Sequence, residues 1–179
     1  SGIKAIPNLD QKNIAVTVTA DNCTTGDLVE VNILDKGKVV ASATGFPGSP
    51  LRLAIAEPKL WSPDSPFLYD MTAELKRGGK TVDKVDSYTA MRKIGTARDK
   101  AGILRMTLND EPLFHYGPLD QGWWPDGLFT APTDEALLFD IVKAKELGYN
   151  MIRKHVKVEP ARWYYHCDRE GILVWQDMP

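Results

Sequence analysis

Polar side chains suited to ligand binding stand at the ends of two apolar segments near the C-terminus. Arg153 and His155 lie at the end of segment 150–156, and Asp177 follows segment 172–176. If these segments are neighbouring parallel strands, their carboxyl ends open into one crevice, where α/β proteins bind ligands. A guanidinium, an imidazole and a carboxylate there would hold a ligand carboxylate or sugar hydroxyls. The alternative is structural, with Arg153 in a buried ion pair and His155 as a hydrogen-bonded core histidine.

The loop 117–127 adds a second group of candidate residues. It is too long for a simple connection, and it places Trp123 and Trp124 beside the carboxylates of Asp120 and Asp126. Flat indole rings stack on the apolar C–H faces of a pyranose, and carboxylates accept hydrogen bonds from its hydroxyls. The loop therefore indicates a sugar, with Asp120 and Trp123 as substrate-binding residues. Equally open is that the two tryptophans only fill the underside of a surface loop.

Other clusters of reactive side chains are weaker. His115, His155 and Asp177 could bind a divalent metal in a metal-dependent hydrolase, but neither H-x-H nor HExxH spacing supports this alternative. Residues 166–168 (His-Cys-Asp) resemble a nucleophile cluster only superficially, because neighbouring residues on a helix point in different directions. The sequence contains no GxGxxG, P-loop or GxSxG motif. We therefore expect neither a metal nor a cofactor.

Composition limits the kinds of partner. The 179 residues include 22 Lys and Arg against 24 Asp and Glu, a net charge of −2 that provides no positive surface for nucleic acid. No apolar run approaches the roughly 20 residues of a membrane span, so we expect no membrane partner. Cys23 and Cys167 are too few for a disulfide framework and are expected to be free thiols.

The chain up to residue 93 has the pattern of a β-sandwich. Period-two alternation of apolar and polar residues predicts strands at 14–19, 29–34, 51–55, 69–75 and 80–85. Glycines in the connections 35–38 and 76–80 suit hairpin turns, which require positive φ. Roughly seven strands in about 90 residues without a helical stretch are typical of an immunoglobulin-like β-sandwich.

From residue 94 onward the periodicity changes. A hairpin is predicted at 103–116, followed by a helix at 134–147 with Thr133 as its N-cap and Gly148 at its end. A strand, a second helix with Pro160 in its first turn and a third strand are predicted at 150–156, 160–170 and 172–176. In the strand 150–156, alternation places Arg153 and His155 on one face and Lys154 on the other. The order β-α-β-α-β implies parallel strands, either in a small open sheet or in part of a larger barrel.

Five stretches in this order resemble glycoside hydrolase family 2, which includes β-galactosidases, β-glucuronidases and β-mannosidases. They are PKLWSPDSPFLY at 58–69, MRKIG at 91–95, LNDEPL at 108–113, DIVKAKELGYNMIR at 140–153 and CDREGILVW at 167–175. The resemblance implies an immunoglobulin-like domain at 1–93 and the start of a TIM barrel at 94–179. It implies a retaining exo-acting enzyme of this family, often periplasmic or secreted.

The resemblance also assigns places to individual residues. Arg153 corresponds to a barrel arginine near the sugar subsite and His155 to a place beside it, although the R-x-x-H-x-P pattern is altered here. Asp120 falls near an acidic residue of the family's first barrel loop. Residues 175–177 (Trp-Gln-Asp) are similar to the "WQD" of mannosidase-like members, which brings Asp177 to the same pocket.

The resemblance places both catalytic glutamates beyond residue 179, after the fourth and seventh barrel strands. We therefore expect this chain to be catalytically inactive alone, a fragment with a substrate pocket but no catalytic residue. An incomplete barrel exposes a strand edge and apolar helix faces, so we also expect self-association. The alternative from another functional class is a non-catalytic carbohydrate-binding or spacer module.

Overall fold

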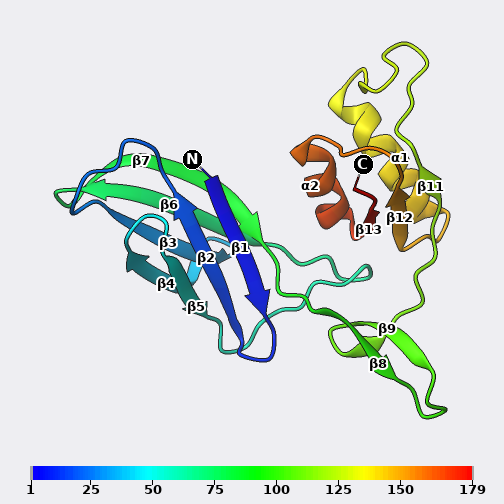
Figure 1. Cartoon of the computed structure of the whole chain (residues 1–179), viewed down its shortest axis with the longest axis horizontal. Helices are drawn as coiled ribbons and strands as arrows, with labels where there is room; N and C mark the ends of the chain where they lie inside the picture. The colour runs from blue at the N-terminus through cyan, green and yellow to red at the C-terminus, as the bar shows by residue number, and fades with distance from the viewer. Residues whose placement is uncertain (1, 179) are drawn as a thin grey trace.

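A computed structural model describes residues 2–178 and shows a mostly β protein in two parts. The N-terminal part is built from two antiparallel sheets. The C-terminal part carries both helices on one face of a short parallel sheet, and the hairpin that connects the two parts along the chain lies below the C-terminal part in Figure 1. Neither helix in the described part of the chain has the length and apolar character needed to cross a membrane.

The N-terminal part contains one sheet of three strands and one of four. The first sheet has the order β1 (Gly2–Asn8), β2 (Asn13–Thr19) and β5 (Pro50–Ala54). The second has the order β4 (Lys38–Gly45), β3 (Leu28–Asp35), β6 (Tyr69–Arg77) and β7 (Lys80–Thr89). All five predicted strands are present, because their alternating apolar residues form one buried face on each sheet.

The core of this part lies between the two sheets. Ile14 and Val16 from β2 are fully buried together with Val31 and Ile33 from β3. Burying one such aliphatic side chain contributes about 1.5–3 kcal/mol to folding. The core is therefore the main source of stability of the N-terminal part.

A small antiparallel sheet follows, in the order β10 (Glu111–Pro112), β9 (Leu104–Leu108) and β8 (Ile94–Arg98). Asn109 and Asp110 join β9 to β10 with φ angles of 55° and 69°. Two consecutive positive φ angles are typical of a tight hairpin turn, and Asn and Asp tolerate them. The predicted hairpin is thus confirmed, with a shorter second strand than expected.

The C-terminal part is an α/β unit of three parallel strands. The sheet order is β11 (Leu119–Asp120), β12 (Met151–Lys154) and β13 (Leu173–Gln176), with α1 (Asp134–Glu146) and α2 (Ala161–Glu170) in the two connections. The Thr133 hydroxyl accepts a hydrogen bond from Ala136 N at 3.1 Å, as predicted for an N-cap. Gly148 has φ +84°, the left-handed conformation expected just after the helix.

Three boundaries differ from the sequence prediction. The first parallel strand is not part of the hairpin 103–116 but lies at β11, inside the predicted loop, where its backbone pairs with β12. Pro160 is the N-cap residue of α2 rather than part of its first turn. β12 ends at Lys154 instead of residue 156, because Val156 turns the chain with φ +54°.

The two faces of the parallel sheet have different neighbours. Ile152 packs with the helices in a cluster that includes Ile141, Trp163 and Cys167. Met151 packs on the opposite face against Trp61. The alternation predicted for β12 is therefore confirmed: Lys154 is buried on the helix side and Arg153 is exposed on the other.

The N-terminal part and the α/β unit meet at Trp61 and Asp168. The buried Trp61 donates from Nε1 to the Asp168 carbonyl at 2.6 Å. The Asp168 carboxylate accepts hydrogen bonds from Tyr88 at 3.0 Å and Arg92 at 3.1 Å. Burial, together with the nearby Asp168 charge, raises the pKa of the Tyr88 hydroxyl. Asp168 thus serves contact between the two parts and not nucleophilic chemistry.

Both cysteines are free, as predicted. Cys23 is exposed, and Cys167 is buried between α2 and the sheet. Burial raises the pKa of the Cys167 thiol, because the thiolate would lie in an apolar environment. Cys167 is therefore a packing residue.

Candidate functional site

The ends of β12 and β13 carry an Arg–Asp pair, so Arg153 and Asp177 lie together at one edge of the sheet, as expected. Arg153 Nε lies 3.3 Å from Asp177 Oδ1, and Arg153 Nη2 lies 3.0 Å from Asp177 Oδ2. The pairing follows from the register, which aligns Arg153 with Trp175, two residues before Asp177. Both side chains are partly exposed at the carboxyl edge of the sheet. A two-pronged pair of this kind fixes the orientation of the carboxylate and leaves oxygen lone pairs for a ligand hydroxyl.

His155 joins this pair to the loop after β11. Gln121 Nε2 lies 2.9 Å from His155 Nδ1, and with the amide nitrogen as donor Nδ1 accepts. The ring proton is then on Nε2, which lies 4.0 Å from Asp177 Oδ2. Three adjacent strand ends therefore bring Gln121, His155, Asp177 and Arg153 together. Sequence reasoning missed Gln121, although its place directly after Asp120 at a strand end could have suggested it.

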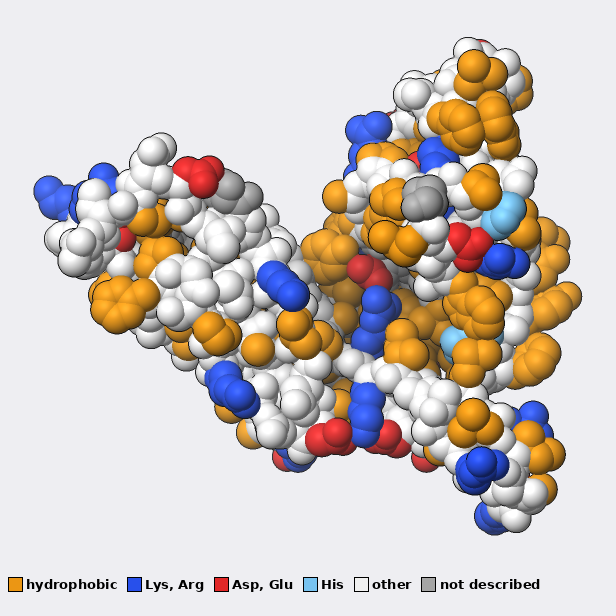
Figure 2. Space-filling model, viewed as in Figure 1, with side chains coloured by type: hydrophobic (Ala, Val, Ile, Leu, Met, Phe, Trp, Pro, Cys, Tyr) orange, Lys and Arg blue, Asp and Glu red, His pale blue; other side chains and the backbone are white. Residues whose placement is uncertain are grey.

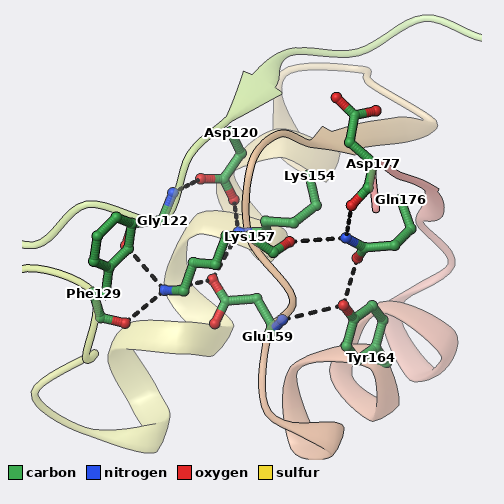
Figure 3. A network of polar contacts seen from close by, with 9 residues as sticks. All are labelled: Asp120, Gly122, Phe129, Lys154, Lys157, Glu159, Tyr164, Gln176 and Asp177. Atoms are coloured by element: carbon green, nitrogen blue, oxygen red, sulfur yellow. Dashed lines mark hydrogen bonds and ion pairs between the residues drawn. The ribbon is translucent and has the colours of Figure 1, made fainter. Parts of the chain in front are cut away.

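A second set of charges lies behind this edge, on the helix side (Figure 3). Lys154, whose side chain is 1% exposed, bonds Asp120 at 2.5 Å and Glu159 at 2.9 Å. Its ammonium also lies 4.4 Å from the ring centroid of Trp163. Such desolvated ions are tolerated only when well paired. This network was not predicted, because sequence alone assigned Lys154 to the face opposite the site and gave it no partner.

Asp120 lies at a strand end, as predicted, but its carboxylate is occupied. Oδ2 binds Lys154, and Oδ1 accepts from Gly122 N at 2.7 Å. The backbone carbonyl of Asp120 accepts from His155 N at 2.9 Å. Asp120 therefore ties three segments of the chain together, and its direct contact with a substrate stays a prediction.

The two loop tryptophans have separate environments. Trp123 is 56% exposed and stacks against Phe129, which is 47% exposed, with ring centroids 4.1 Å apart and an angle of 37°. Trp124 packs against the helix cluster and exchanges two backbone hydrogen bonds with Leu128. The loop-filling interpretation therefore applies to Trp124, which packs under the loop. Trp123 is exposed, as the sugar-stacking interpretation requires, and forms an exposed aromatic step with Phe129.

The turn after β12 holds an unfavourable backbone conformation. Val156 has φ +54°, and a left-handed conformation costs a non-glycine residue about 1–2 kcal/mol. For a β-branched residue it marks a constrained position. The turn separates His155, which faces the Arg–Asp pair, from Lys157, which faces the buried charges.

The hypothetical metal ligands are not assembled. His115 Nδ1 accepts from Trp175 Nε1 at 2.8 Å, and burial lowers the pKa of His115, which keeps the ring neutral. Residues 2–178 contain no group of three or more His, Cys, Asp or Glu side chains that could hold a metal ion. His115, His155 and Asp177 therefore do not form such a group.

Comparison with known proteins extends these observations. A β-galactosidase of Lactococcus lactis is 25% identical over 171 residues, which cover 95% of this chain and 16% of that protein. A putative β-glucuronidase of Formosa agariphila is 26% identical, with 96% and 17% coverage. A β-glycosidase of Bacteroides vulgatus, known from its crystal structure, matches 97% of this chain and 23% of its own with a TM-score of 0.82 and 24% identity.

The chain thus spans about one sixth of the length of these two curated relatives. The family model described as glycosyl hydrolases family 2 matches residues 1–92, which is more than half of the 179 residues. This chain belongs to family 2 of the glycosyl hydrolases.

Proposed function

We propose that this chain supplies two consecutive parts of a retaining, exo-acting glycoside hydrolase. Residues 1–93 form an immunoglobulin-like sandwich domain, and residues 94–179 form the opening strands and helices of a TIM-barrel catalytic domain. Two face-to-face antiparallel sheets support the first assignment, and the parallel order β11-β12-β13 with intervening helices supports the second. The short span of the chain relative to its relatives is consistent with a segment of a larger enzyme.

One observation carries the functional part of the proposal. Arg153, His155 and Asp177 meet at the carboxyl ends of adjacent parallel strands, which is where barrel enzymes bind their substrates. In the proposed enzyme, these residues hold hydroxyls of the terminal sugar. Trp123 lies on the neighbouring loop and offers an exposed ring for the C–H face of a pyranose.

The proposed role of this chain is substrate binding without bond cleavage. Retaining hydrolysis uses two carboxyl groups about 5 Å apart, one as nucleophile and one as acid and base. The two carboxylates at the strand ends are already engaged, Asp120 with Lys154 and Asp177 with Arg153. By the family resemblance, other segments of the enzyme would carry both catalytic carboxyl groups, and this chain alone would be inactive.

The test compares a longer protein that contains this segment with the 179-residue chain. Both are assayed on aryl β-galactoside, β-glucuronide, β-mannoside and β-glucoside. We expect turnover by the longer protein only, and a loss of at least about 100-fold in kcat/KM for Arg153→Ala, equivalent to about 2.7 kcal/mol. Silence of the longer protein, with saturable sugar binding by the short chain, would instead indicate a binding module.

We also propose that the isolated chain self-associates through its α/β unit and hairpin. Exposed apolar side chains gather there more densely than on the sandwich (Figure 2). Phe114, Leu119, Phe139 and Leu147 are all exposed. Large exposed apolar surfaces favour association. Sedimentation velocity should show a dimer or larger species, and a monomer at high concentration would refute this proposal.

A further inference from the structure

Lys157 is a mostly buried cation with three oxygen partners. Its side chain is 10% exposed, and Nζ lies 3.0 Å from Glu159 Oε1, 3.1 Å from the Gly122 carbonyl and 2.6 Å from the Phe129 carbonyl. The two carbonyls accept hydrogen bonds from the ammonium group, and Glu159 is its ion-pair partner. Both carbonyls belong to the loop after β11, drawn beside Lys157 in Figure 3.

These two carbonyls bracket the aromatic step. Gly122 directly precedes Trp123, and the second carbonyl belongs to Phe129 itself. The two rings stack on each other while large parts of both remain exposed. A single ammonium therefore holds both chain segments from which the aromatic step is built.

The backbone around Lys157 is shaped for this contact. A Cβ on Gly122 would lie 2.5 Å from Glu159 Oε1 and 2.8 Å from Lys157 Nζ, and the φ of Gly122 is +65°. Glycine is therefore required for this close approach. On the other side, the left-handed turn at Val156 precedes Lys157 and directs the chain from the open edge of the sheet toward the buried charges.

Glu159 anchors the contact to the rest of the edge. It is buried and pairs with Lys154 of β12 as well as with Lys157. Its backbone N–H donates to the Tyr164 hydroxyl, which in turn donates to Gln176 of β13. The aromatic step is thereby fixed relative to the strand ends that carry Arg153 and Asp177.

We propose that Lys157 is a positioning residue that holds Trp123 and Phe129 as a stacking platform for a pyranose ring, beside the Arg153–Asp177 pair. This inference rests on the proposed function for its ligand. Lys157 itself touches no sugar, and it acts through the two carbonyls. Its loss should therefore weaken substrate binding and leave the chemical step unchanged.

The kinetic test uses the longer enzyme with its best aryl glycoside. Lys157→Met and Trp123→Ala should each raise KM about tenfold with kcat within about twofold, and a tenfold change corresponds to about 1.4 kcal/mol. Their double mutant should show little more than either single change, because both remove the same platform. Multiplicative effects, an unchanged KM or a loss confined to kcat would overturn the proposal.

Two further variants separate positioning from general destabilisation. Lys157→Arg keeps the charge beside Glu159 but cannot place its planar fork on all three acceptors, so it should fold and raise KM by a smaller factor. It also provides the test if Lys157→Met does not fold, and an unchanged KM in Lys157→Arg would then refute the proposal. Lys143→Met, which removes an exposed pair with Glu146 on α1, is the matched control and should behave as wild type.

Hydrogen exchange on the 179-residue chain tests the contact without any activity. Lys157→Met should raise exchange of amides in 121–131 about tenfold or more, with strand β2 unchanged as the internal control. Unchanged exchange in 121–131 would refute the positioning role. An inactive wild-type enzyme would refute the proposed function alone, because the exchange result does not depend on turnover.

Discussion

The sandwich and the α/β unit differ in how completely they bury ion pairs: the buried Asp27 of the sandwich pairs with the half-exposed Arg77, whereas the α/β unit buries both partners of a pair. The sandwich core is apolar, and its ion pair between Lys76 and Glu30 lies at 2.6 Å on a surface that solvent reaches. The α/β unit buries the pair of Lys154 and Glu159 at a similar distance of 2.9 Å. A solvated pair contributes little to stability, whereas a desolvated pair becomes costly once one partner is lost. The sandwich therefore acts as a stable support. In the α/β unit, the desolvated ions reduce stability but fix the strand ends where a ligand would bind.

Among the substitutions considered, Lys154→Met should cause the largest loss of stability. A small loss would contradict the contrast between the two regions. The substitution removes a cation from a site shared by Asp120 and Glu159, and breaking a buried pair costs about 3–5 kcal/mol. We expect the lower end, about 3 kcal/mol, because Lys157 still neutralises Glu159. Urea unfolding of the chain measures the loss.

The matched control for this experiment is Lys76→Met in the sandwich. Its pair with Glu30 has similar geometry but is solvated, so a much smaller loss is expected. Equal losses from the two substitutions would show that burial does not distinguish the two regions.

Trp61→Phe tests how strongly the two regions are coupled. The change removes the hydrogen bond to the Asp168 carbonyl and leaves a small cavity, at a cost of about 2 kcal/mol. We expect the α/β unit to unfold before the sandwich in this variant, as followed by hydrogen exchange during a urea titration. If both regions of the variant unfolded in one transition, at the same urea concentration as wild type, the Trp61–Asp168 contact would contribute little to the coupling between them.

Asp27 gives the sandwich a dependence on acid. The Arg77 guanidinium, with help from Thr24 N–H, holds the pKa of the Asp27 carboxyl well below its usual range. A carboxyl with a lower pKa in the folded state contributes stability that is complete above its unfolded pKa of about 4 and is lost as pH falls through the folded value. Thermal melts from neutral pH into this acid range should show a smaller decline for Asp27→Asn than for wild type.

Val156→Gly should have the smallest effect on stability, and it should stabilise the chain where the other substitutions destabilise it. Glycine removes a left-handed penalty of about 1–2 kcal/mol but loses about 0.5–1 kcal/mol through the freer unfolded chain, a net gain near 0.5 kcal/mol. Val158→Gly, two residues further on and also exposed, lacks the penalty and should only destabilise. A loss of stability in Val156→Gly would show that the side chain, and not the backbone, matters at this turn.

Local patterns explain which elements were predictable. Alternation in β2 and β3 gave their buried faces, and Thr133 and Gly148 marked both ends of α1. The proximity of Arg153 and Asp177 followed from the expectation that the two segments are neighbouring parallel strands. These features depend on neighbours in sequence or on simple topology.

Features that depend on distant partners were missed. β11 has only two residues and forms because its backbone pairs with β12, so no run of alternating or apolar residues predicts it. The buried state of Lys154 requires Asp120, 34 residues earlier, and no local pattern links the two. Whether Trp123 or Trp124 is exposed depends equally on how the loop meets the helix cluster.

Asp168 has a consequence for the order in which the chain folds. Its bonds reach Trp61, Tyr88 and Arg92, which are 107, 80 and 76 residues earlier in the chain. During synthesis the sandwich is complete before α2 exists, and domains generally fold as units from the N-terminus. We expect the ring of Trp61, which is buried in the folded chain, to remain exposed to solvent until α2 has been synthesised and packs against it. A pause in translation between the two parts would prolong the time in which a chaperone or a second chain could bind the exposed Trp61 in place of α2.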